Sequence, residues 1–222
     1  MKNKIALVLA VMLFFSTSIK AQVPVREEPR HPPVLQNKYF RLLDVWLPPG
    51  DTSLFHIHAI PSLFIILSNT FTGSQIKGGD WAKSNDTAGK TWYRLFYPDI
   101  LIHRVANFDT VPLHVNDIEI LSSYDSNHVT QRKHLPFPLL FENEKAFAYS
   151  LTKSNFNSQI IKNRGPLIAE LVSGDGVIFN DAVSKQSIKI KAGKYLYIEP
   201  GTSFNFASPG TGENKMVLFE IK

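Results

Sequence analysis

The stretch Gly50-Asp51-Thr52-Ser53-Leu54-Phe55-His56-Ile57-His58 determines how the rest of the sequence is interpreted. Side chains alternate between the two faces of a β-strand, so His56 and His58 would share one face. A third histidine, His103, stands in the later apolar stretch Pro98-Asp99-Ile100-Leu101-Ile102-His103-Arg104-Val105-Ala106-Asn107. Three imidazoles on neighbouring strands are a common ligand set for first-row transition metals. We therefore predict that His56, His58 and His103 bind one divalent metal ion.

The other apolar segments have the length and composition of β-strands. They are short, rich in β-branched and aromatic residues, and separated by proline, glycine and asparagine. No segment shows a sustained helical period with caps. The main strands are expected in residues 39–46, 54–58, 63–67, 91–97, 100–105, 113–121 and 216–221. The expected fold class is all-β.

The second half of the chain repeats the first half in reduced form. Residues 166–174 align with residues 61–69 without a gap. The same alignment places Ile161, Asn163 and Asn205 at the positions of the three histidines, so all three histidines are missing from the second copy. Their joint loss indicates that they act as one unit. We expect two β-barrels in tandem, with a metal site in the first barrel only.

The first residues of the chain have the layout of a secretory signal peptide. A basic start is followed by a short apolar run and by a small residue, Ala21, before Gln22. The apolar run is too short to span a bilayer, so we expect cleavage near Ala21, export to the periplasm or the medium, and no stable membrane insertion. The expected divisions are a signal peptide in 1–21, an N-terminal arm in 22–37, a first barrel in 38–122, a linker in 123–139 and a second barrel in 140–222.

The composition excludes some classes of function. The formal charge of the whole chain is +5, and it falls to +2 when the three lysines of the signal peptide (Lys2, Lys4 and Lys20) are removed. Such a small charge predicts no nucleic-acid partner. The chain contains no cysteine, so disulfides and thiolate chemistry are excluded.

The spacings Gly50-x5-His56-x-His58 and Pro98-x4-His103-x3-Asn107 resemble the two motifs of the cupin superfamily. The resemblance covers most of the mature chain. It implies a bicupin, with two antiparallel jelly-roll barrels of which the second is degenerate, and a site in the mouth of the first barrel. The glutamate ligand of the family is replaced by Ser62 or Leu63. The resemblance therefore supports three histidine ligands and leaves the fourth position to water or substrate.

Two residues on the strand before His103 are candidates for substrate binding. Trp92 and Arg94 would form a substrate wall with a charge clamp. The alternative, which the sequence favours, is that Trp92 packs in the core and Arg94 lies in solvent.

The remaining histidines are expected outside the site. His31, His128 and His134 lie in predicted surface loops, and His114, which matches no motif, is expected in solvent. No carboxylate falls within either motif, so no catalytic acid or base is identified.

The predicted ligand set indicates a class of small-molecule partner. Three neutral imidazoles leave the metal ion its full positive charge, which favours carboxylates, enolates or thiolates in the open positions. Iron, manganese, nickel, copper and zinc all suit such a set. The leading hypothesis is an exported metal-dependent enzyme of oxygenase or isomerase type. The alternatives are a non-catalytic small-molecule or sugar-binding cupin and a structural cupin that forms a homodimer.

Overall fold

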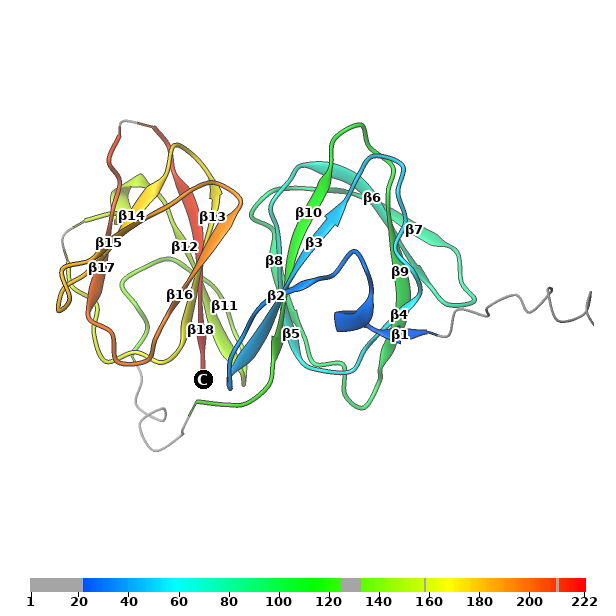
Figure 1. Cartoon of the computed structure of the whole chain (residues 1–222), viewed down its shortest axis with the longest axis horizontal. Helices are drawn as coiled ribbons and strands as arrows, with labels where there is room; N and C mark the ends of the chain where they lie inside the picture. Colours follow the sequence, from blue (N-terminus) through cyan, green and yellow to red (C-terminus); the bar gives the residue numbers. More distant parts are fainter. Residues whose placement is uncertain (1–21, 125–132, 158, 211) are drawn as a thin grey trace, which may run out of the picture.

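The structure is a computed structural model that describes residues 22–124, 133–157, 159–210 and 212–222. The predicted signal peptide lies outside the described residues. The described chain forms two β-barrels that lie side by side (Figure 1). Its helical content is limited to short 3-10 turns such as η1 (Val25–Glu27) and η3 (Lys153–Asn155). Within these residues, no helix has the length and apolar character needed to cross a membrane. The prediction of an all-β fold is confirmed.

The first barrel contains ten strands: β1 (Val23–Pro24), β2 (Pro33–Gln36), β3 (Phe40–Leu47), β4 (His56–His58), β5 (Ser62–Ile66), β6 (Thr70–Ile76), β7 (Trp81–Asp86), β8 (Thr91–Arg94), β9 (Leu101–Asn107) and β10 (Leu113–Ile120). They form two five-stranded sheets, in the orders β1-β4-β9-β6-β7 and β2-β3-β10-β5-β8. The pairing is antiparallel except between β1 and β4. This is the arrangement of a jelly-roll barrel.

The second barrel contains eight strands: β11 (Leu139–Glu142), β12 (Ala146–Leu151), β13 (Leu167–Ser173), β14 (Val177–Asp181), β15 (Ser187–Ile190), β16 (Lys194–Ile198), β17 (Phe204–Ala207) and β18 (Lys215–Ile221). A five-stranded sheet in the order β11-β12-β18-β13-β16 faces a three-stranded sheet in the order β15-β14-β17. All of these pairs are antiparallel.

The two aligned sequence segments occupy the same place in the two barrels. Strand β5 lies between β10 and β8, and strand β13 lies between β18 and β16. Every residue of β5 is buried, as its continuous apolar sequence predicts for a strand covered on both faces.

Both faces of β5 are buried because the barrels share an apolar core. Phe40, Ile65 and Ile118 of the first barrel belong to the same buried cluster as Ile168 and Phe219 of the second. One polar pair crosses this core: the side-chain amide of Asn116 donates to both carboxyl oxygens of Glu170, each at 2.9 Å. Burial raises the pKa of Glu170 to about 8.

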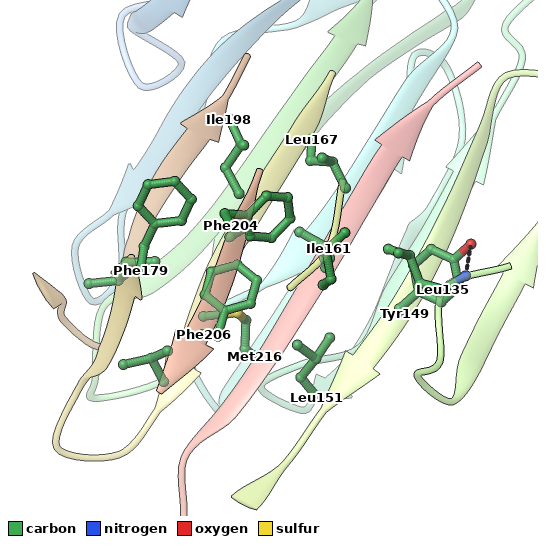
Figure 2. Close-up of a cluster of buried hydrophobic side chains, with 14 of the residues drawn as sticks. Leu135, Tyr149, Leu151, Ile161, Leu167, Phe179, Ile198, Phe204, Phe206 and Met216 are labelled. Atoms are coloured by element: carbon green, nitrogen blue, oxygen red, sulfur yellow. Dashed lines mark hydrogen bonds between the residues drawn. The ribbon is translucent and has the colours of Figure 1, made fainter. Parts of the chain in front are cut away.

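The interior of the second barrel is filled by apolar side chains (Figure 2). Phe204 is fully buried, and its ring centroid lies 5.6 Å from that of Phe179 and 5.3 Å from that of Phe206. Ile161 and Met216 belong to the same cluster. These side chains occupy the part of the second barrel that would correspond to a binding site.

The structure corrects two of the positions aligned with the histidines. Ile161 forms a bridge with Phe204, as His56 pairs with His103, so Phe204 rather than Asn205 occupies the third position. The alignment was wrong by one residue, and a shift of one residue turns a side chain to the opposite face of the sheet. Asn163 is exposed, with a φ of 57°, and lies outside the barrel interior.

Candidate metal centre

The three histidines predicted as metal ligands meet inside the first barrel. Strands β4 and β9 are antiparallel neighbours, and His56 lies directly opposite His103. His58 follows two residues along on the same face of β4. Each of the three imidazoles offers one nitrogen to a group whose members all lie within 4.8 Å of one another.

The motif residues around the histidines hold these strands together. Gly50 has a φ of 75°, in the left-handed region that glycine tolerates, and its N–H donates to the carbonyl of Asn107 at 3.0 Å. The side-chain amide of Asn107 donates to the carbonyls of Leu47 and Val111 at 2.9 and 2.8 Å. Gly50 and Asn107 therefore tie the segment before β4 to the end of β9.

Hydrogen bonds fix the orientation of two of the rings. The Nδ1 atom of His56 lies 2.9 Å from the carbonyl oxygen of Leu54, and Nδ1 of His103 lies 2.8 Å from the hydroxyl of Ser74. A carbonyl only accepts, so His56 carries its proton on Nδ1. The Nε2 atoms of His56 and His103 are buried without a hydrogen-bond partner, and so is Nδ1 of His58.

The environment keeps the three rings neutral. Burial lowers the pKa of His56 to about 2 and that of His103 to about 4, and nearby His31 adds to both shifts. Burial also lowers the pKa of His58 well below its usual range, and the nearby His56 lowers it further. Neutral imidazoles with free lone pairs are the form that binds a metal ion. The residues present therefore fit a divalent transition metal.

The position of the missing glutamate supplies no ligand. Ser62 is buried at the start of β5, and its hydroxyl donates to the carbonyl of Ile60 at 3.1 Å. Leu63 packs in the core shared by the two barrels.

A cavity of about 360 Å³ opens beside the histidines. Trp92 lines it and stacks on Phe64, with ring centroids 4.9 Å apart and planes 9° apart. Arg94 also lines the cavity and is exposed, with its guanidinium carbon 5.0 Å from the centroid of the Phe96 ring. Phe96 in turn stacks on His58 at 4.9 Å. Trp92 and Arg94 thus lie on the cavity wall.

The expectation that His31 lies in a surface loop was wrong. His31 is only 4% exposed, lines the cavity and lies 4.4 Å from His56 between ring centroids. Its Nδ1 lies 2.5 Å from the carboxylate of Glu28, which also accepts the N–H groups of Arg30 at 2.6 Å and Leu54 at 3.0 Å. The N-terminal arm folds back along β4, and the Glu28-x2-His31 spacing is the sequence signal that could have indicated this pair.

The cavity also contains a buried carboxylate that lies outside both sequence motifs. Asp117 on β10 is 1% exposed and lines the cavity. Its Oδ2 lies 3.5 Å from Nδ1 of His58, and no hydrogen bond of ordinary length and angle reaches either of its oxygens. Burial raises the pKa of Asp117 well above its usual range, nearby Glu119 adds to the shift, and the hydroxyl of Ser62 opposes it. The available signal was a pair of carboxylates, Asp117 and Glu119, two residues apart within the expected strand 113–121, because such groups are costly to bury.

The other histidines lie away from the cavity. The expectation that His114 is exposed was wrong, because its ring is buried by stacking on Trp46 at 4.0 Å and its Nε2 lies 2.7 Å from Asp44. His134 is exposed and lies 3.0 Å from Glu142. His128 lies outside the described residues.

Comparisons with protein-family models and with curated proteins find no match to this sequence. Solved structures do match. AerE from Microcystis aeruginosa has a TM-score of 0.58 at 12% identity, over 88% of this chain and 98% of that chain. A cupin 2 conserved barrel domain protein from Leptotrichia buccalis has a TM-score of 0.55 at 10% identity, over 86% and 87%. Salicylate 1,2-dioxygenase from Pseudoaminobacter salicylatoxidans has a TM-score of 0.58 at 9% identity, over 82% and 68%.

At these identities the likeness concerns the fold and not the activity. Two of the matched structures are named for a cupin domain or for a dioxygenase, and each matches both barrels of this chain over most of its length. The pairs of facing antiparallel sheets agree with that likeness. This chain has the fold of the cupin superfamily.

Proposed function

We propose that the first barrel binds one divalent transition-metal ion through His56, His58 and His103 and acts on a small anionic organic molecule in the adjoining cavity. The observation that supports this most directly is the group of three imidazoles, each offering one nitrogen within 4.8 Å of the others, in which Nε2 of His56 and Nε2 of His103 are buried without a hydrogen-bond partner. Iron, manganese, nickel, copper or zinc would fit. Such an ion supplies Lewis-acid or redox chemistry when bound.

The cavity wall supports a planar, negatively charged substrate. Trp92 and Phe64 present flat apolar surface. Arg94 makes no ion pair with any described residue, and a second cation, Lys83, also lines the cavity. A guanidinium recognises a carboxylate through two parallel hydrogen bonds. The wall would orient the ring of the substrate, and the cations would hold its carboxylate.

The surroundings of the histidines would exclude bulk water. His56 and His58 are both nearly fully buried, and the arm residue His31 covers His56. Electrostatic interactions are stronger in such a dry site than in water. His31, whose ring is held by Glu28, would add a hydrogen-bonding group beside the substrate.

We further propose that the chain is an exported bicupin whose second barrel has lost its site. The signal-peptide layout of residues 1–21 supports export. Ile161 and Phe204 in place of two histidines support the loss. A homodimer remains part of the proposal, and no nucleic-acid partner is proposed.

Elemental analysis of the chain from Gln22 tests the metal site. The parent protein, reconstituted with each candidate metal, should hold close to one ion per chain. His56→Ala and His103→Ala should lose it, because each removes one of three ligands. His134→Ala is the matched control, since this exposed histidine lies away from the cavity, beside Glu142 and Phe147, and its removal should leave the metal content unchanged. A parent protein that binds none of the metals would overturn the proposal.

A second measurement separates enzyme from binding protein. Salicylate is a suitable first probe because one protein of similar fold is a salicylate 1,2-dioxygenase. Oxygen uptake by the metal-loaded protein with salicylate and with smaller carboxylates would support an oxygenase. Binding of these probes without oxygen uptake or product formation would favour the non-catalytic small-molecule or sugar-binding alternative.

A further inference from the structure

We infer that Asp117 is a positioning residue of the metal centre: it accepts the Nδ1–H of His58 and supplies the negative charge that the missing glutamate would have brought. This inference rests on the proposed metal site. It assigns a role to a side chain that lies outside both sequence motifs.

Asp117 lies on β10, the strand next to the β5 position of the missing glutamate. In the antiparallel pair β5–β10, Ser62 lies opposite Glu119 and Phe64 lies opposite Asp117. Phe64 and Asp117 both line the cavity, and residues two apart share a face. Ser62, which replaces the glutamate, therefore faces the same interior as Asp117. The carboxylate missing from β5 is present on the adjacent strand.

Asp117 and Glu119, its neighbour on the same face of β10, differ in their hydrogen-bond partners. Glu119 is also buried, but one of its oxygens accepts a hydrogen bond from Arg41 at 2.5 Å. No hydrogen bond of ordinary length and angle reaches either oxygen of Asp117, and the nearby Ser62 hydroxyl, which donates to Ile60, only partly offsets the burial that raises the pKa of Asp117. A buried carboxylate without a partner costs several kcal/mol. Such an unmatched group inside a cavity points to a ligand or a binding partner that the group serves.

The imidazole of His58 lies within reach of the Asp117 carboxylate. Oδ2 of Asp117 is 3.5 Å from Nδ1 of His58, and that nitrogen is itself buried without a partner. One group is an acceptor and the other can carry a proton. A proton held on Nδ1 leaves the lone pair on Nε2, which is the usual arrangement of a carboxylate, a histidine and a metal in series.

Asp117 acts through His58 and not as a direct ligand. The group of atoms that lie within 4.8 Å of one another contains the three histidines and does not include Asp117. Its carboxylate would nevertheless reduce the net charge of three neutral imidazoles and a divalent ion from +2 to +1. The centre would then hold a carboxylate substrate less tightly than the bare ion would, and release it more readily.

Metal affinity tests this inference. The dissociation constant is measured by chelator competition for the parent, Asp117→Asn and Asp117→Ala, and the absorption spectrum of the Co²⁺ form is recorded. Loss of such a partner typically weakens metal binding about 10- to 100-fold. We expect that range for Asp117→Ala, a smaller loss for Asp117→Asn because its side-chain oxygen still accepts, and a shifted Co²⁺ spectrum in both.

Asp86→Asn is the matched control. Asp86 also lines the cavity, but its carboxylate is engaged by Thr72 at 2.6 Å and by Lys90 at 3.1 Å. This variant removes the same charge from the same cavity, and its metal affinity should stay close to that of the parent. Urea unfolding of the metal-free variants tests whether they fold, and removal of a poorly partnered buried carboxyl group should not destabilise the protein.

The outcomes separate this inference from the proposed function. A parent that binds metal, with both Asp117 variants at parental affinity and an unchanged Co²⁺ spectrum, overturns the role of Asp117 and leaves the metal site standing. Equal losses in Asp86→Asn and the Asp117 variants would also overturn it, because the effect would then be one of general charge. A parent that binds no metal overturns both.

Discussion

The two barrels place related strands around very different interiors. In the first, His56 lies opposite His103 and a cavity of about 360 Å³ opens beside them. In the second, Ile161 bridges Phe204, and Phe179 and Phe206 complete a filled core. The same pair of positions thus holds imidazoles with unpartnered nitrogens in one barrel and apolar side chains in the other.

This difference shows how a site with buried polar groups lowers the stability of a barrel. Buried polar atoms without partners destabilise a protein, whereas buried apolar side chains stabilise it. The second barrel also contributes Ile168 and Phe219 to the core that it shares with the first. The filled interior of the second barrel and the core shared by both barrels therefore offset part of the cost of the unpartnered polar groups in the first barrel.

The largest effect is expected when the first interior is converted to the second. The double substitution His56→Ile and His103→Phe copies Ile161 and Phe204 into the first barrel. Metal binding should fall to background, since one histidine cannot hold the ion. The metal-free protein should be at least as stable as the parent, because two buried nitrogens without partners are removed. Elemental analysis and urea unfolding provide the two measurements.

A cavity made in the interior of the second barrel should destabilise the protein and leave the metal site of the first barrel intact. Phe204→Ala opens a cavity in the second core, and truncation of a buried phenylalanine costs about 3–5 kcal/mol. The free energy of unfolding should fall by this amount, while folded protein keeps its metal content. Phe108→Ala, at a 41% exposed position of the first barrel, is the control and should cost much less. Loss of metal from folded Phe204→Ala protein would show that the two interiors are coupled.

Acid should destabilise the protein through the buried histidines of the first barrel, which have no counterpart in the second. The pKa values of His56 and His103 in the folded protein, about 2 and about 4, lie below the usual 6.5. Their stabilising effect is therefore present above pH 6.5 and is lost as the pH falls towards these values. The metal-free parent should lose roughly 1.4 kcal/mol per pH unit for each histidine below pH 6.5.

The double variant with isoleucine and phenylalanine is the control for this acid effect. Only His58 of the three would still titrate in it, so urea unfolding between pH 7 and pH 5 should give a much smaller slope. Equal slopes in the parent and the variant would contradict the neutral, buried state of His56 and His103.

The sequence predicted those parts of the molecule that depend on local pattern. Period-two alternation and turn residues indicate the strands, and the all-β fold follows. The shared face of His56 and His58 depends only on the spacing of two residues within one strand. Their approach to His103 needed one further assumption, that β4 and β9 are neighbours, and the structure pairs these strands directly.

The site residues that the sequence did not predict depend on pairing between segments that are distant in the chain. His31 reaches the cavity because β1 pairs with β4 and the Glu28 carboxylate holds the arm in place. Asp117 reaches it because β10 pairs with β5. The choice of Asn205 in place of Phe204 failed because register between strands is set by long-range packing, which a sequence alignment of two diverged halves does not resolve.

The junction between the barrels should respond to pH in the opposite direction from the histidines. The pKa of Glu170 in the folded protein, about 8, lies above its ordinary value of 4.5. Its stabilising effect is therefore fully present below pH 4.5 and is lost as the pH rises towards 8. Glu170→Gln keeps an uncharged group of the same shape beside Asn116 and should be more stable than the parent at pH 8, on the order of 2 kcal/mol.

Urea unfolding at pH 5 and pH 8 tests this smallest effect. The gain of Glu170→Gln over the parent should appear at pH 8 and shrink at pH 5, where Glu170 is already neutral in the folded protein. Asn116→Asp is the complementary change, because it places a second carboxyl group beside Glu170 and should destabilise the protein most at pH 8. A parent whose stability does not decline towards pH 8 relative to Glu170→Gln would mean that Asn116, which donates to both oxygens of Glu170, stabilises the charged carboxylate enough to offset its burial.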